Sequence, residues 1–295
     1  MKKWILKRQE IIKLLPERKD DSNKGTYGKL LIIAGRHECA GAAILSTLAA
    51  MRCGLGMVKV ISDKGNFQPL MSIVPEALFS SDTSADSIQE SLSWADAALI
   101  GPGIGMDEKA EELLLALLKS RGIPLAVDAD GLNLISQDHT LMLLLKEKAR
   151  TDPVILTPHL MEMSRLCGKT ISWLKEHREE AATEYSRQYG AVIALKDAIT
   201  VTAAPDGELI INTTGNNGMS TAGSGDVLSG VIASFLAQGC KALEAAGLGV
   251  YIHGAAGDMA AARYGVRGMK ALDIAESLAT VLMQCDRIKD KEKEA

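Results

Sequence analysis

The stretch Ala97-Ala98-Leu99-Ile100-Gly101-Pro102-Gly103-Ile104-Gly105 sets the pattern of the fold. A short, fully apolar run ends in a glycine-rich turn, and a helix-like pattern follows at about 107–120. A run this short that is apolar throughout is typical of a strand buried on both faces of a sheet. The stretch therefore predicts one strand–turn–helix unit of an α/β protein.

The same unit recurs on both sides of this stretch. Such alternation predicts a mostly parallel sheet with helices on both faces. The order changes only where runs at 199–202 and 209–211 flank Asp206-Gly207, which predicts a hairpin. The other predicted strands lie at 30–34, 57–61, 125–127, 154–156 and 192–195, and the other predicted helices at about 41–53, 131–136, 159–167 and 172–189.

No repeat or low-complexity linker divides the chain. The apolar spacing over 3–15 predicts an amphipathic helix, which either contacts another copy or folds back on its own domain. We therefore expect an N-terminal helical segment at 1–20, a single catalytic domain at 21–285 and a charged, frayed tail at 286–295.

Composition excludes several classes of protein. The net charge of −4 over 295 residues and an aromatic content of 4% do not fit a nucleic-acid-binding surface. No apolar run reaches the roughly 18 residues of a membrane span, and no signal peptide begins the chain. Five cysteines without a C-x-x-C pair fit a reducing compartment, so we expect a cytoplasmic protein.

Small or ionisable residues follow nearly every predicted strand. In a parallel sheet the carboxyl ends of the strands share one edge, and ligands bind there. These strand-end segments therefore favour a ligand site at that edge. They are Gly35-Arg36, Gly101–Gly105, Asp128-Ala129-Asp130, Thr157-Pro158-His159 and Lys196-Asp197.

The richest segment is Thr221-Ala222-Gly223-Ser224-Gly225-Asp226, within a span at 215–230 that holds five glycines. A glycine-rich loop that opens a helix offers free backbone N–H groups to phosphate. We expect Asp226, in the first helical turn, to stay ionised. It either caps the helix or accepts a proton from a hydroxyl that attacks the phosphate.

Other phosphate motifs fail. Gly168-Lys169-Thr170 is not a Walker A loop because Met163 occupies the position of its first glycine. The glycines of 101–105 are not spaced as G-x-G-x-x-G, so a Rossmann site is weakly supported. His159 and Lys196 could each contact a ligand or face solvent, and His253 fits helix packing.

Taken in order, these motifs resemble the ADP-dependent (S)-NAD(P)H-hydrate dehydratases, a branch of the ribokinase-like superfamily. The resemblance covers about 20–285. Its pieces are Lys24–Gly28, Ala40–Ala43, Gly101–Gly105, Asp128–Asn133, Thr157–His159, Leu195-Lys196 and Asn212–Gly230.

The resemblance implies a ribokinase-like three-layer sandwich, in which helices flank a mostly parallel central sheet. It implies a repair reaction in which ADP phosphorylates the hydroxyl of hydrated NADH or NADPH and phosphate is then eliminated. Mg²⁺ is the implied ion, and the implied assembly is a homotetramer. Whether ADP or ATP, and which of the two hydrates, is preferred stays open, and no metal ligand is implied.

By matching position, Asp226 is the base on the hydrate hydroxyl. The implied nucleotide-phosphate residues are Gly223, Ser224, Gly225, Lys196, Asp197, Ala198, Ile199 and Thr200, and the implied hydrate-binding residues are Ala40, Gly103, Gly105, His159 and Asp226.

The chain departs from the family pattern at Arg36, Leu160, Met161, Asn217 and Ala222. None of these changes removes Asp226 or Gly225. Two rival functions share the phosphate loop: a ribokinase-like kinase of a vitamin alcohol, and a nucleotide sensor without turnover.

Overall fold

A computed structural model describes residues 3–294, and the side chains of 3–289. Within these residues ten strands form one sheet, in the order β1-β10-β9-β8-β7-β6-β5-β2-β3-β4. Only β9 runs antiparallel to its neighbours, so the predicted mostly parallel sheet and the predicted hairpin are confirmed. The strands are β1 (Lys3–Ile5), β2 (Lys29–Ile33), β3 (Met57–Ile61), β4 (Leu78–Ser80), β5 (Ala97–Ile100), β6 (Leu125–Val127), β7 (Val154–Leu156), β8 (Val192–Leu195), β9 (Val201–Ala203) and β10 (Leu209–Ile211).

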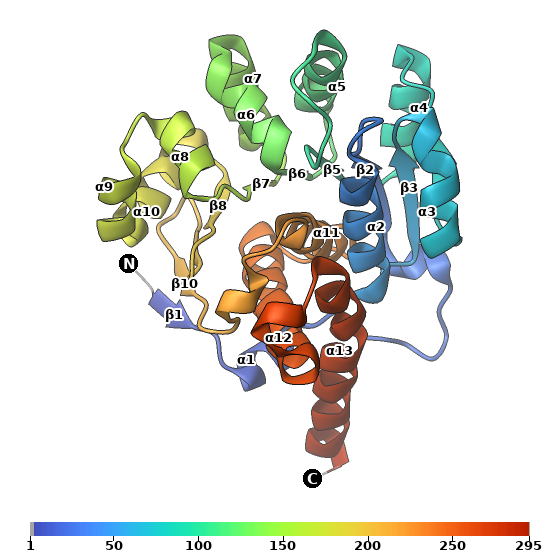
Figure 1. The fold of residues 1–295 in the computed structure, drawn as a ribbon, viewed down its shortest axis with the longest axis vertical. Helices are drawn as coiled ribbons and strands as arrows, with labels where there is room; N and C mark the ends of the chain where they lie inside the picture. Colours follow the sequence, from blue (N-terminus) through green and yellow to red (C-terminus); the bar gives the residue numbers. More distant parts are fainter. Residues whose placement is uncertain (1–2, 295) are drawn as a thin grey trace.

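Helices cover both faces of the sheet (Figure 1). On one side lie α4 (Ala85–Trp94), α5 (Glu108–Lys119), α6 (Ala129–Gln137), α7 (His139–Thr151), α8 (Leu160–Cys167), α9 (Ile171–Glu176) and α10 (Arg178–Tyr189). The other helices are α1 (Arg8–Leu14), α2 (Ala40–Arg52), α3 (Phe67–Ile73), α11 (Ser224–Ala237), α12 (Ala242–Gly268) and α13 (Ala271–Glu294).

Two hydrophobic cores lie on the two sides of the sheet. Successive strand side chains point to opposite faces. Accordingly, Leu30 and Ile32 of β2 pack in a core with α2 and α11, whereas Leu31 and Ile33 pack in a core with α5 and α7. Every residue of β5 is buried, as expected for a strand covered on both faces.

The N-terminal prediction was wrong in part. Residues 3–5 form a strand that pairs in parallel with β10, and the helix begins only at Arg8. An edge strand presents unpaired backbone groups, and β1 satisfies those of β10. Ile11 and Ile12 are buried in the core beside α12 and α13, so the helix folds back on its own domain. At the other terminus, 286–294 continue helix α13 instead of forming a frayed tail.

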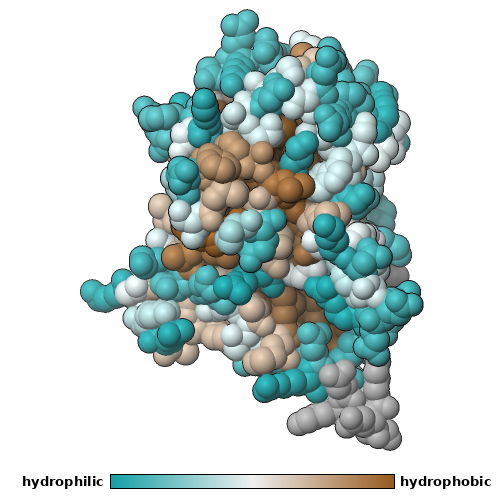
Figure 2. Space-filling view, turned by 90° about the vertical axis from the view of Figure 1, so that its right-hand side faces the viewer, coloured by the Kyte–Doolittle hydropathy of each residue, from teal (hydrophilic) through white to brown (hydrophobic). Residues whose placement is uncertain are grey.

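The opposite edge of the sheet is apolar. Phe67, Ile73 and Leu78, in and beside α3 and β4, are exposed. Figure 2 views the side of the molecule on which this edge lies and shows apolar surface running across its middle. None of the helices within 3–294 has an apolar stretch long enough to cross a bilayer.

Candidate active site

The glycine-rich loop forms a nest of backbone N–H groups at the N-terminus of α11. Gly223 precedes the helix with φ +87°, a conformation that favours glycine. A Cβ on Gly223 would lie 2.4 Å from Leu45 Cδ1, so the position has no room for a side chain. The N–H groups of Gly225 and Asp226 fall in the first helical turn, where no intrahelical acceptor exists. They are therefore available to an anion.

Lys196 lies over this nest. Its Nζ is 3.5 Å from the position that a Cβ on Gly225 would take. It donates to Asp128 Oδ1 at 2.7 Å and lies 4.0 Å from Glu162 Oε2. Burial lowers the pKa of Lys196, but Asp128 and Glu162 raise it, and the net shift is upward. The nest thus faces a charged ammonium group.

The backbone holds Lys196 in place. Its N–H donates to Pro158 O at 2.8 Å, and a parallel bridge joins it to His159 at the adjoining ends of β7 and β8. The apolar strand β8 therefore delivers the lysine to the ligand edge of the sheet, as parallel topology requires.

Asp226 stands next to the nest with a pKa far above that of an ordinary carboxyl. Burial, together with Asp128 and Asp130, raises its pKa, Lys196 opposes them, and the net result is a pKa of about 7. Asp226 is therefore only partly ionised near neutral pH and not fully ionised as expected, because burial and the neighbouring carboxylates outweigh the helix N-terminus. Near neutral pH this carboxyl is poised to take up or release a proton.

Glu162 and His159 close the site on the β7 side. His159 N donates to Glu162 Oε2 at 2.8 Å, and His159 Nδ1 accepts from the N–H groups of Met161 and Glu162 at 3.1 Å. His159 thus caps α8 and also lines the pocket. Burial raises the pKa of Glu162 to about 7. Burial and Lys196 lower the pKa of His159, so its ring is neutral.

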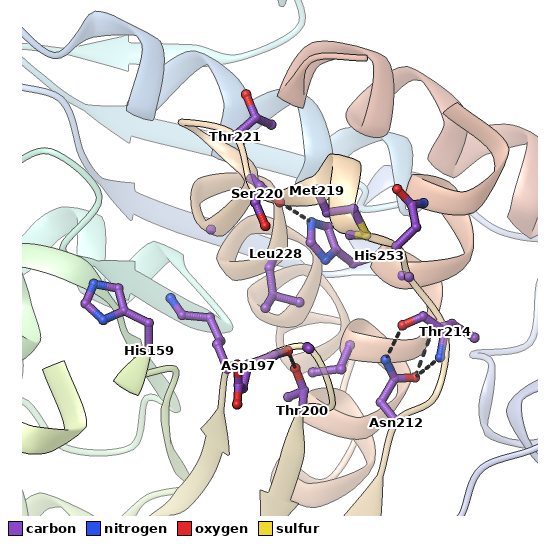
Figure 3. A pocket seen from close by; sticks show the side chains of 18 residues that line it. His159, Asp197, Thr200, Asn212, Thr214, Met219, Ser220, Thr221, Leu228 and His253 are labelled. Carbon is purple, nitrogen blue, oxygen red and sulfur yellow. Dashed lines mark hydrogen bonds between the residues drawn. The ribbon is translucent and has the colours of Figure 1, made fainter. Parts of the chain in front are cut away.

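A pocket of about 480 Å³ opens beside the nest (Figure 3). The loop after β10 forms one wall, where Asn212 Nδ2 donates to Thr214 O at 3.0 Å and Thr214 Oγ1 donates to Asn212 Oδ1 at 2.9 Å. A Cβ on Gly254 of α12 would lie 2.2 Å from Thr214 Oγ1, so glycine lets helix and loop meet. The lining residues are His159, Lys196, Asp197, Ala198, Thr200, Asn212, Thr214, Gly215, Asn216, Met219, Ser220, Thr221, Ser224, Gly225, Leu228, Val250, His253 and Gly254.

Most of the predicted nucleotide residues meet here. Within 196–200 only Ile199 is absent from the lining, and its side chain is exposed. Asp197 pairs with Arg178 of α10 at 2.7 Å, which fixes the turn after β8. The pocket therefore joins the predicted nucleotide segment to the phosphate nest.

Of the residues predicted for the hydrate, His159 and Asp226 lie beside the nest, whereas Ala40, Gly103 and Gly105 lie elsewhere along the edge. A Cβ on Gly103 would lie 2.8 Å from Cys39 Cβ, immediately before Ala40 opens α2. Gly105 N donates to Asp130 Oδ2 at 2.9 Å. Because Asp130 also shifts the pKa of Asp226, this group lies close to Asp226. Its residues follow β5 and β2, which β6 and β7 separate from β8 and the nucleotide segment.

Sequence reasoning missed several residues of the site. Asp128 and Asp130 belong to a strand-end segment that was expected at the ligand edge, but neither residue was expected to have a role of its own. His253 was expected to pack in its helix, but it lines the pocket with Nε2 3.4 Å from Ser224 Oγ. Burial lowers the pKa of His253 to about 4, so its ring is neutral. Among the described residues, no three His, Cys, Asp or Glu side chains gather as a metal cluster.

Comparison with known proteins agrees with this geometry. The family model described as NAD(P)H-hydrate dehydratase matches residues 30–280. The chain belongs to this family. The predicted resemblance is thereby confirmed.

Several relatives of the family are similar over most of the chain. The ADP-dependent (S)-NAD(P)H-hydrate dehydratase of Neisseria meningitidis is 35% identical, over 88% of this chain and 86% of its own length. The bifunctional NAD(P)H-hydrate repair enzyme of Moorella thermoacetica is 40% identical, over 91% of this chain and 52% of its own length. The chain thus spans about half the length of the bifunctional relatives that it matches.

Solved structures confirm the ribokinase-like fold. The NAD(P)H-hydrate dehydratase of Bacillus subtilis, co-crystallised with ATP and Mg²⁺, superposes with a TM-score of 0.85 at 31% identity, covering 95% of this chain and 98% of the other. A ribokinase-like superfamily protein of Enterococcus faecalis superposes with a TM-score of 0.84 at 30% identity, covering 96% of each chain.

Proposed function

We propose that the protein uses ADP to dehydrate hydrated NADH and NADPH. The hydrate hydroxyl attacks the terminal phosphorus of ADP, which releases AMP. Loss of phosphate and of a ring proton then restores the reduced nicotinamide. Hydroxide is a poor leaving group and phosphate is a good one, which is the chemical reason for spending ADP. Membership of the dehydratase family and the relative named from Neisseria meningitidis support this assignment.

The observation that carries the proposal is the position of Asp226. Its carboxyl group adjoins the nest and has a pKa of about 7, which suits a general base near neutral pH. A carboxylate beside a site that only held phosphate would repel its ligand. A carboxylate that removes the proton from an attacking hydroxyl belongs beside the phosphate that is attacked.

The remaining roles follow from the two sides of Asp226. ADP would occupy the 480 Å³ pocket, with Lys196, Asp197, Ala198 and Thr200 around it and its phosphates on Gly223, Ser224 and Gly225. The hydrate would lie along Ala40, Gly103 and Gly105. This arrangement directs its hydroxyl toward both Asp226 and the terminal phosphate.

Magnesium fits this arrangement without a metal cage. Mg²⁺ is commonly held by one or two carboxylates together with substrate phosphates, and Asp128 and Glu162 offer carboxylates on either side of Lys196. When bound, the ion neutralises charge on the phosphates. The ammonium group of Lys196 would also neutralise charge on the phosphates.

The assay is recovery of the absorbance of reduced nicotinamide from hydrated NADH with ADP and Mg²⁺. Replacement of the proposed base, Asp226→Asn, should lower turnover by at least about 10²-fold, while ADP still binds. Asp86→Asn is the matched control, because Asp86 is exposed in the first turn of α4. Near-normal turnover by the Asp226 variant would mean that this aspartate only caps α11.

The same assay separates the rival functions. A kinase of a vitamin alcohol would yield a stable phosphorylated product and leave the hydrate unchanged. A sensor would bind ADP and form no AMP. Recovery of NADH with stoichiometric AMP excludes both.

Homotetramer assembly and a cytoplasmic location are part of the proposal. The exposed apolar edge at Phe67, Ile73 and Leu78 supports self-association, and the five free cysteines support a reducing compartment. Light scattering should give the mass of an oligomer, and Leu78→Lys should reduce it. A monomeric wild type would contradict the assembly.

A further inference from the structure

Arg36 lies beside the proposed hydrate site and has no role in the chemistry described above. Its backbone is fixed, because its N–H donates to Gly103 O at 2.7 Å and its carbonyl accepts from Asn66 Nδ2 at 3.2 Å. Its side chain crosses Gly105: Cδ and Nη1 each lie 3.2 Å from the position that a Cβ on Gly105 would take. A glycine at 105 therefore makes room for this arginine.

The order of the strands places Arg36 on the substrate side of Asp226. Asp128 and Asp130 follow β6, Gly103 and Gly105 follow β5, and Arg36 follows β2, and these strands are adjacent in the sheet (Figure 1). Neighbouring strands lie about 4.8 Å apart, so the β2 end is roughly 10 Å from the β6 end. In a hydrated dinucleotide, a ribose separates the reacting ring from the first phosphate.

The electrostatic environment calls for a cation at this point. Asp128, Asp130, Glu162 and Asp226 are all carboxyl groups of the proposed site, and they would repel the anionic dinucleotide. Lys196 is engaged by Asp128 on the nucleotide side. The guanidinium of Arg36 supplies a positive charge beside Gly105, one of the proposed hydrate residues.

The guanidinium of Arg36 interacts with the side chain of Cys39 and with the carboxylate of Glu38, and the contact with Glu38 is easily replaced. Its Nη2 lies 3.5 Å from Glu38 Oε2, and both side chains are exposed. An exposed ion pair of this kind contributes little, whereas a guanidinium binds phosphate with two parallel hydrogen bonds. Arg36 also lines a cavity of about 130 Å³ with Asp63, Asp107 and Lys109, so the site continues beyond it.

We propose that Arg36 binds a phosphate group of the hydrated dinucleotide, exchanging Glu38 for it. This inference rests on the proposed function, and it adds a specificity residue to the substrate side. The phosphate is either the pyrophosphate, present in both hydrates, or the 2′-phosphate, present only in the NADPH hydrate.

The test compares Arg36→Ser with wild type at saturating ADP. KM for the hydrate should rise about tenfold or more, as expected for loss of a charge-assisted hydrogen bond, with kcat and KM for ADP within about twofold. Arg36→Lys should recover part of the loss, because it keeps the charge without the fork. Arg52→Ser is the matched control: Arg52 is also exposed and pairs with Glu276 at 2.7 Å.

The two hydrates distinguish the two phosphates. An equal rise in KM for both hydrates identifies the pyrophosphate, and a rise confined to the NADPH hydrate identifies the 2′-phosphate. Unchanged KM for both overturns the inference and leaves the proposed function standing.

A binding measurement keeps the inference independent of turnover. If wild type restores no NADH, the proposed function fails, and calorimetric titration with the NADPH hydrate then decides about Arg36. About tenfold weaker binding by Arg36→Ser supports the phosphate contact. Equal binding, or none to wild type, overturns it.

Discussion

Two lysines, one buried and one partly buried, are each paired with an aspartate but lie in different surroundings. Lys148 of α7 is 0% exposed, and its Nζ donates to Ser120 O, Ser120 Oγ and Asp152 Oδ2 at 3.1, 3.3 and 3.2 Å. Lys196 is 17% exposed, donates to Asp128 Oδ1 at 2.7 Å and faces the pocket. An ammonium group has three N–H donors. All three are used at Lys148, while within the described side chains only one is used at Lys196.

The pKa shifts of the two lysines run in opposite directions. Burial lowers the pKa of Lys148, and Asp152 compensates only in part. At Lys196 burial acts in the same sense, but Asp128, Glu162 and Asp226 outweigh it and raise the pKa. At Lys148, which is structural, each N–H donor of the ammonium group has an acceptor. The lysine of the site has surplus carboxylates and spare donors, which is the arrangement expected of a group that binds a ligand.

The largest effect on stability should come from Lys148→Met. It leaves Asp152 buried and unpaired, which should cost about 3–5 kcal/mol of unfolding free energy. Denaturant titration measures the loss, and kcat/KM of the folded fraction should not change. The double variant Lys148→Met with Asp152→Asn should recover much of the stability, because no unpaired charge remains. If Lys148→Met lost activity without losing stability, Lys148 would be a functional residue and not a structural one.

Lys196→Met should mainly weaken ADP binding, and it should reduce stability less than Lys148→Met does. Removal of the ammonium over the nest should raise KM for ADP about 10–100-fold, as expected for lost hydrogen bonds to a charged group. The loss of unfolding free energy should be smaller than for Lys148→Met, because Lys196 is partly exposed and makes one hydrogen bond within the described part of the chain, whereas Lys148 is fully buried and makes three. Unchanged KM together with an equal loss of stability would make both lysines structural.

Much of the fold could be predicted because its central strands are apolar throughout. Runs such as 97–100 and 154–156 matched β5 and β7 closely. The edge strands β1 and β4 were missed: each has three residues, and each forms because a neighbouring strand offers unpaired backbone groups. β7 also has three residues but is buried throughout, whereas β1 and β4 are exposed or half-buried and lack the apolar run that marks a central strand.

The site could be predicted as far as residue type and strand position allow. Lys196 and the nest followed from a strand end and a run of glycines. The pKa of Asp226 could not be predicted, because it depends on burial and on Asp128 and Asp130. These two residues lie about a hundred residues away in sequence and approach Asp226 only in the folded chain. His253 was misjudged for the same reason, since only the fold brings α12 to the pocket.

The smallest predicted effect concerns Asp226, whose carboxyl group acts on Lys196 through its charge. The pKa of Asp226 is about 7 in the folded protein against an ordinary 3.8. Between about pH 4 and 7 the unfolded chain therefore gives up this proton first, and the contribution of Asp226 to stability falls as pH rises through that window. Above pH 7 the cost of the buried charge is fully present.

Asp226→Asn removes this cost, so its melting temperature should exceed that of wild type by a few degrees at pH 8, and by less at pH 5. Differential scanning calorimetry at the two pH values measures the gap, and Asp86→Asn should show none. Wild-type turnover should rise through pH 7 as the base loses its proton. If the difference in melting temperature did not grow with pH, Asp226 would be ionised like a surface carboxyl. The difference between the Lys148 site and the Lys196 site would then depend on the two lysines alone. A growing gap would mean that the burial that makes Asp226 a base at neutral pH is also what destabilises the fold there.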